Sequence, residues 1–217
     1  MNQDALITTV VGAHDAKHKG DRLYSSAVQL MAGIDIAGIS EQEVVAVVQP
    51  FLYRWGRMGR VLGRAEFSGW QGQAAAVIQS HSGLLEQFRG ADIASVDLSR
   101  QGSAAVTLYE SLKEAVGQIS AAKVLNLICP DFFPLWDNAV ANAMRAELAN
   151  LSGYSFDASV DPFSGEDYLR FMEGVQLFMS RHAGVISVLS SRYGQKRLKI
   201  VDACFWWMVG RPLFVVF

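Results

Sequence analysis

The chain has 217 residues, of which 51% are hydrophobic and 18% are charged. This composition excludes a disordered tail, a collagen and a coiled coil, and it is sufficient to build a large hydrophobic core. The formal net charge of −2 excludes a protein that coats nucleic acid through overall positive charge, but it leaves room for a local basic face. Cys129 and Cys204 lie far apart in the sequence, which is typical of reduced thiols in a cytoplasmic protein.

The sequence predicts no membrane-spanning segment. The longest stretch without a charged residue, 67–85, contains several Gln and Ser residues and a His, which the bilayer core disfavours. No Lys or Arg precedes an apolar run at the N-terminus, so a secretory signal is not expected. We therefore expect a cytoplasmic location.

The first 22 residues contain two patterns. The run Leu6–Val11 is rich in β-branched residues and favours a short strand, and the polar residues that surround Gly20 favour a loop. We predict an N-terminal segment over 1–22, followed by one helical domain over 23–217.

Helical signals dominate the rest of the chain. Ser40 and Glu43 form a capping box, and apolar residues follow it at helical spacing up to Trp55. Pro50 interrupts this pattern and predicts a kink or two abutting helices. The same periodicity occurs over 108–119, 140–151, 168–182 and 198–208, and 153–165 has the composition of a loop. The predicted fold class is mainly α, with minor β structure near the N-terminus.

The most informative stretch is 119–137. Ser120 can cap a short helix that carries Lys123 in its first turn, where the helix dipole disfavours the charged amine. Pro130 is expected to end this helix, and an apolar, aromatic loop follows. Asp137 then occupies an N-cap position at the start of the next helical pattern.

This order of residues resembles the helix-hairpin-helix DNA glycosylase superfamily, and in particular its 8-oxoguanine DNA glycosylase-like branch. In that family a lysine early in the second helix of a hairpin is followed by a proline-containing apolar segment and an aspartate that opens the next helix. The resemblance implies that Lys123 attacks the sugar C1′ of a flipped-out nucleotide and forms a Schiff base. It implies that Asp137 stabilises positive charge on the sugar.

A group of four arginines precedes this region: Arg54, Arg57, Arg60 and Arg64. On one continuous helix they would fall within an arc of about 120°, which could neutralise DNA phosphates or could be a solvated face. A second basic cluster, at 192–199, precedes the aromatic run Phe205-Trp206-Trp207, in which we expect at least two rings to pack in the core.

His14 and His18 are four residues apart, so on a helix they would lie on one turn and could both bind a metal ion. No strong third ligand lies nearby. We therefore predict no metal site, and no cofactor motif is present in the sequence.

Two functions remain open at this point. One is excision of a damaged base, such as an oxidised purine, by Lys123 and Asp137. The alternative is a catalytically silent helical module that binds nucleic acid or a protein, and the low charge and the absence of glycine over 119–122 favour it. The apolar run 213–217 is a candidate surface for a protein partner. An enzyme requires the Lys123 amine and the Asp137 carboxylate to face one cleft.

Overall fold

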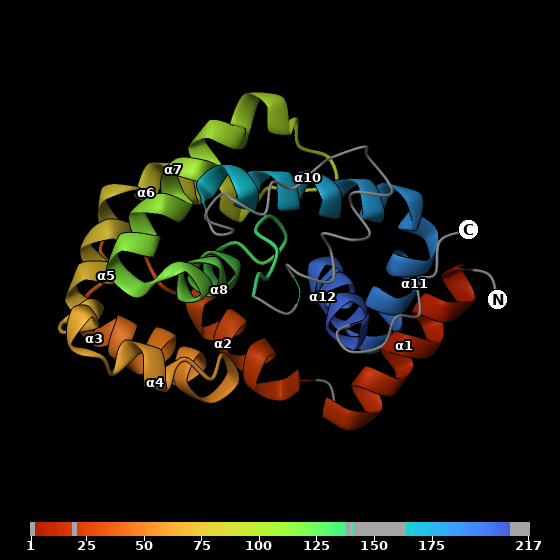
Figure 1. Cartoon of the computed structure of the whole chain (residues 1–217), viewed down its shortest axis with the longest axis horizontal. Helices are drawn as coiled ribbons and strands as arrows, with labels where there is room; N and C mark the ends of the chain where they lie inside the picture. Colours follow the sequence, from red (N-terminus) through yellow and green to blue (C-terminus); the bar gives the residue numbers. More distant parts are fainter. Residues whose placement is uncertain (1–2, 19–20, 138–139, 141–163, 209–217) are drawn as a thin grey trace.

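The computed structural model describes residues 3–18, 21–137, 140 and 164–208, and every regular element within these ranges is a helix (Figure 1). The mainly α class is therefore confirmed. None of the described helices is long and apolar enough to cross a membrane.

The N-terminal part of the chain contains short helices. They are α1 (Gln3–His18), α2 (Arg22–Ala32), α3 (Glu41–Glu43), the π-helical segments η2 (Val44–Val48) and η3 (Phe51–Trp55), α4 (Gly59–Leu62), the 3₁₀ turn η4 (Ala65–Phe67), α5 (Trp70–Ser80) and α6 (Ser82–Arg89). The other described helices are α7 (Leu98–Val116), α8 (Gln118–Ile128), α10 (Gly165–Arg181), α11 (Ala183–Tyr193) and α12 (Arg197–Met208).

The predicted strand over Leu6–Val11 is wrong, because this run lies within α1. Its β-branched residues are buried at helical spacing, with Ile7, Val10, Val11 and His14 forming one face. This face packs against α11 and α12, so the two ends of the described chain lie side by side (Figure 1). Tertiary packing therefore overrides local β propensity. The loop expected around Gly20 is also partly helical, since α1 continues to His18.

Several local predictions are confirmed. Ser40 and Glu43 form a reciprocal capping box. The pattern over 168–182 corresponds to α10, and the pattern over 198–208 corresponds to α12. The pattern over 140–151 and the predicted loop at 153–165 fall almost entirely outside the described residues, as does the apolar run 213–217.

Helix α8 is the centre of the fold. Every residue from Ser120 to Ile128 is buried, because α7, α2 and η3 all pack around this helix. A helix that is buried on all sides is typically apolar on all sides. Among the polar exceptions in α8, the side chain of Asn126 accepts a hydrogen bond from Tyr24 and donates one to the carbonyl of Phe133, whereas the buried Oγ of Ser120 has no hydrogen-bond partner among the described residues.

A single residue, Gly117, joins α7 to α8. Its φ of 77° and ψ of 160° lie in a region that is essentially restricted to glycine. A Cβ atom at this position would also lie 3.0 Å from the Phe67 ring. The tight connection between the two helices therefore depends on glycine.

We expect Gly117→Ala to lower the free energy of unfolding by about 1–3 kcal/mol, because alanine would be strained in this conformation. Gly83→Ala in α6 is the matched control, since a Cβ atom there meets nothing within 4 Å. Chemical denaturation measures both changes. Equal stability of the two variants would show that the Gly117 conformation is not required.

Candidate functional site

Lys123 is the sixth residue of α8, which begins directly after Gly117. The prediction that Ser120 caps this helix and that Lys123 lies in its first turn is therefore wrong. The helix begins earlier than expected because Gly117 ends α7 and is itself the N-cap residue of α8, although the apolar periodicity continues across it. The helix dipole consequently does not explain the chemistry of Lys123.

Burial is what sets the properties of Lys123. The side chain is only 9% exposed, and its Nζ donates a hydrogen bond of 2.9 Å to the carbonyl oxygen of Gly56. The pKa of Lys123 is lowered chiefly by desolvation, with smaller contributions from the positive charges of Lys199 and Arg57. Asp137 and Asp202 oppose this shift. The net effect moves the Lys123 amine toward its neutral, nucleophilic form relative to an ordinary lysine.

The carbonyl that accepts this hydrogen bond lies directly after the π-helical segment η3. The segment ends where the N–H of Gly56 bonds to the carbonyl of Phe51, five residues earlier. A Cβ atom on residue 56 would lie 2.8 Å from the Leu52 carbonyl oxygen and 3.3 Å from Cδ of Lys123. Glycine therefore permits the close approach of Lys123, and π-helical segments frequently occur at functional sites.

Asp137 makes the hydrogen bond that the predicted N-cap position requires. Its Oδ1 accepts a hydrogen bond of 2.9 Å from the backbone N–H of Val140, which is the spacing of a helix N-cap. Because the carboxylate is held by backbone geometry, its position is fixed relative to α8.

Lys123 and Asp137 line the same cleft, which has a volume of about 400 Å³. The other residues of the lining come from α1, the start of α2, η3 and its following turn, the segment after α8, and α12: His14, Asp21, Leu23, Arg54, Trp55, Gly56, Arg57, Leu135, Trp136, Val140, Lys199, Asp202 and Trp206. This volume lies within the range of about 300–1,000 Å³ that is typical of small-ligand pockets.

The four arginines do not form one helical stripe. The helix is interrupted after η3, and Arg57 adopts a left-handed conformation with φ of 55°. Over the described residues the cleft lining includes Arg54 and Arg57, but neither Arg60 nor Arg64. All four side chains are exposed. The predicted continuous arc is wrong because the chain leaves the helical conformation at Arg57, between η3 and α4, and because α4 ends at Leu62, before Arg64.

A second lysine, Lys199, also lies in the cleft, and sequence reasoning did not assign it to the site. It is 2% exposed, and its Nζ lies 2.6 Å from Asp202 and 3.1 Å from Asp21. Burial on its own would lower the pKa of Lys199, but Asp202 and Asp21 together raise it. One signal was present in the sequence: Lys199 interrupts the apolar run of α12, where Leu198, Ile200 and Val201 are all buried.

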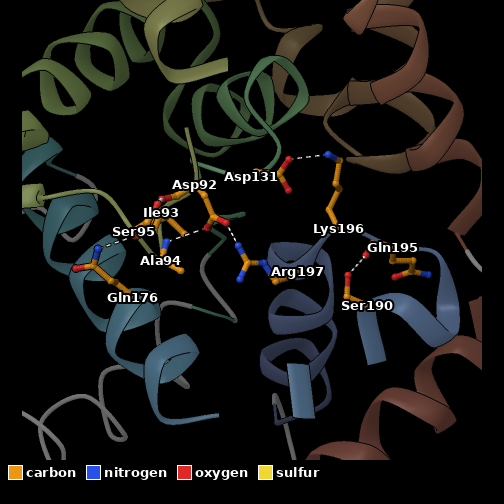
Figure 2. A network of polar contacts seen from close by, with 10 residues as sticks. All are labelled: Asp92, Ile93, Ala94, Ser95, Asp131, Gln176, Ser190, Gln195, Lys196 and Arg197. Atoms are coloured by element: carbon orange, nitrogen blue, oxygen red, sulfur yellow. Dashed lines mark hydrogen bonds and ion pairs between the residues drawn. The ribbon is translucent and has the colours of Figure 1, made fainter. Parts of the chain in front are cut away.

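Ion pairs hold the beginning of α12 in place (Figure 2). Lys196 pairs with Asp131 at 2.6 Å, and Arg197 pairs with Asp92. The second basic cluster is therefore largely neutralised within the protein. These contacts join α12 to the segments that follow α6 and α8, but both pairs are partly exposed, so each is expected to contribute no more than about 1 kcal/mol.

Aromatic rings form much of the cleft wall. Trp55 stacks on Phe51 with a centroid distance of 4.9 Å, and its Nε1 donates to the carboxylate of Asp21. At the edge of the cleft Trp206 is 40% exposed, and its ring makes an edge-to-face contact with His14. Phe205 packs in the core as expected, whereas the side chain of Trp207 lies outside the described residues.

The two cysteines are unpaired and buried, as the sequence predicts, and burial raises the pKa of both thiols. His14 lies in the cleft, while the side chain of His18 is not described. Among the described residues no group of three His, Cys, Asp or Glu side chains is placed to hold a metal ion.

Comparisons with known proteins do not identify a relative. No protein family matches the sequence, and neither the curated proteins nor the solved structures give a significant match. The function must therefore be argued from the cleft itself.

Two substitutions distinguish the effect of the Asp137 hydrogen bond on stability from the effect of its negative charge. Asp137→Asn keeps an oxygen for the N–H of Val140, so the free energy of unfolding should fall by no more than about 1 kcal/mol. Asp137→Ala removes the acceptor and should cost about 0.5–2 kcal/mol. Thermal or chemical denaturation compares the two. Equal losses in the two variants would show that the charge of Asp137, which both lack, stabilises the fold, and that its hydrogen bond to Val140 does not.

Proposed function

We propose that this protein is a DNA glycosylase that excises a damaged base, with Lys123 as the nucleophile and Asp137 as its electrostatic partner. The observation that carries the proposal is that the buried amine of Lys123 and the capping carboxylate of Asp137 line one cleft. A silent binding module has no need of a desolvated amine beside a fixed carboxylate.

The chemistry of Lys123 follows from its surroundings. A neutral amine attacks C1′ of the nucleotide sugar, and the bond between C1′ and the base nitrogen breaks. The electron pair of that bond leaves with the base, which takes up a proton. Loss of a proton from the attacking nitrogen and opening of the sugar ring then give a Schiff base, which water hydrolyses to release Lys123.

The role of Asp137 is electrostatic. Positive charge develops on the sugar as the bond to the base breaks, and a preorganised carboxylate stabilises it without reorganising during the reaction. The hydrogen bond to Val140 supplies this preorganisation. The carboxylate can also receive the proton that the amine loses.

The remainder of the cleft suits a nucleotide. The partly exposed ring of Trp206 offers a surface on which a base can stack, and Arg54 and Arg57 are available to phosphates. Arg60 and Arg64 would then contact the DNA backbone further from the reacting sugar. The choice of an oxidised purine rests on the resemblance of the 119–137 segment. We further propose a cytoplasmic location, where both thiols would stay reduced.

Borohydride trapping tests this proposal. The substrates are labelled duplexes that carry a single 8-oxoguanine, a uracil or an abasic site. We expect the wild type to form a covalent adduct with at least one duplex, and we expect Lys123→Gln to form none. Asp137→Asn should reduce the rate of base release by at least about 100-fold, as expected for the loss of a transition-state charge partner.

Lys196→Gln is the matched control, since Lys196 pairs with Asp131 away from the cleft. It should be trapped as the wild type is. Trapping that persists in Lys123→Gln would overturn the assignment of the nucleophile. Duplex binding without an adduct or base release on any of these substrates would favour the silent module.

A further inference from the structure

We propose that Lys199 is a positioning residue for Lys123: its ammonium group, held between Asp21 and Asp202, cancels carboxylates that would otherwise keep the Lys123 amine protonated. This inference rests on the proposed function, because it explains how the nucleophile is kept in its reactive form.

The geometry places both lysines around one aromatic ring. Nζ of Lys199 lies 4.8 Å from the centroid of the Trp55 ring, and Nζ of Lys123 lies 5.8 Å from it. Both amines are buried, so the charges act on one another with little screening by water. The protonation of either amine therefore depends on the other.

The partners of the two lysines are different. Lys199 has two carboxylates within ion-pair distance, whereas the hydrogen bond of Lys123 goes to the neutral carbonyl of Gly56. The environment of Lys199 thus favours the ammonium ion, and that of Lys123 favours the neutral amine. Environments that move the pKa values of two neighbouring groups apart are typical of sites that assign them different chemical roles.

The charges that face Lys123 come from each of the surrounding segments. Asp137 follows α8, Asp202 and Lys199 belong to α12, and Asp21 precedes α2. The remaining titratable or charged groups of the lining are Arg54, Arg57 and His14.

Within this set Lys199 partly neutralises the negative charge of Asp21 and Asp202. Asp21 and Asp202 carry two negative charges, and Lys199 offsets one of them. Without Lys199 the full charge of both carboxylates would act on Lys123 and stabilise its ammonium form. Asp21 is held additionally by Nε1 of Trp55, so it would stay near the cleft in such a variant.

The test measures the reactivity of the Lys123 amine against pH in the folded, full-length protein. Trace labelling with acetic anhydride modifies only neutral amines, and mass spectrometry quantifies the peptide that contains Lys123. We expect Lys199→Gln to move the midpoint of this profile upward by about one pH unit or more. Lys199→Arg retains the charge and should keep the midpoint near that of the wild type.

Two further variants separate charge from general disruption. Asp202→Asn removes one negative charge and should move the midpoint of the Lys123 profile downward. Loosening of the fold would instead expose Lys123 to water and move the midpoint upward, because burial lowers the pKa of this group. This variant also keeps the proposal testable if Lys199→Gln does not fold. Lys196→Gln removes a positive charge outside the cleft and should leave the midpoint unchanged.

An unchanged midpoint in Lys199→Gln, or an unchanged or raised midpoint in Asp202→Asn, would overturn the proposal. The labelling reports on the amine itself and requires no DNA. Midpoints that move as expected would therefore support the coupling even if no duplex is trapped. Trapping with unmoved midpoints would support the glycosylase and reject the role of Lys199.

Discussion

The burial of α8 is the constraint on which the site depends. Helices pack around it on all sides, so a lysine in its middle cannot extend its amine into bulk water. Lys123 instead donates to the Gly56 carbonyl, which is accessible because η3 ends there and because glycine leaves space for the side chain. The desolvation that lowers the pKa of this amine therefore follows directly from the packing of the central helix.

The remaining site residues come from segments that are distant in sequence. Asp137 is fixed by the turn it caps, Asp21 lies before α2, and Lys199 and Asp202 are carried by α12. The ion pairs of Lys196 and Arg197 anchor the beginning of α12 (Figure 2). The tertiary fold thus determines which charges surround Lys123.

Sequence reasoning succeeded where the signal was local. The capping box at Ser40, the N-cap at Asp137 and the periodicity of α10 each depend on residues within a few positions of one another. It failed at Leu6–Val11, where packing against α11 and α12 overrides β propensity.

The arrangement around Lys123 was harder to predict. The sequence identified Lys123 and Asp137 as a pair, but it attributed the chemistry of the lysine to a helix dipole and not to burial. The proximity of Lys199 could not be inferred from spacing, because only the tertiary fold brings α12 against η3 and α8. A lysine within the buried run of α12 was the one available indication.

The central claim is that Lys123 carries a neutral amine under conditions in which ordinary lysines are charged. An NMR titration of the protein with ¹³C-labelled lysine side chains measures this directly. We predict one lysine resonance that titrates below the ordinary value of about 10.4 and that is absent from Lys123→Gln. If every lysine resonance titrates near the ordinary value, the cleft does not hold a neutral amine and the account is contradicted.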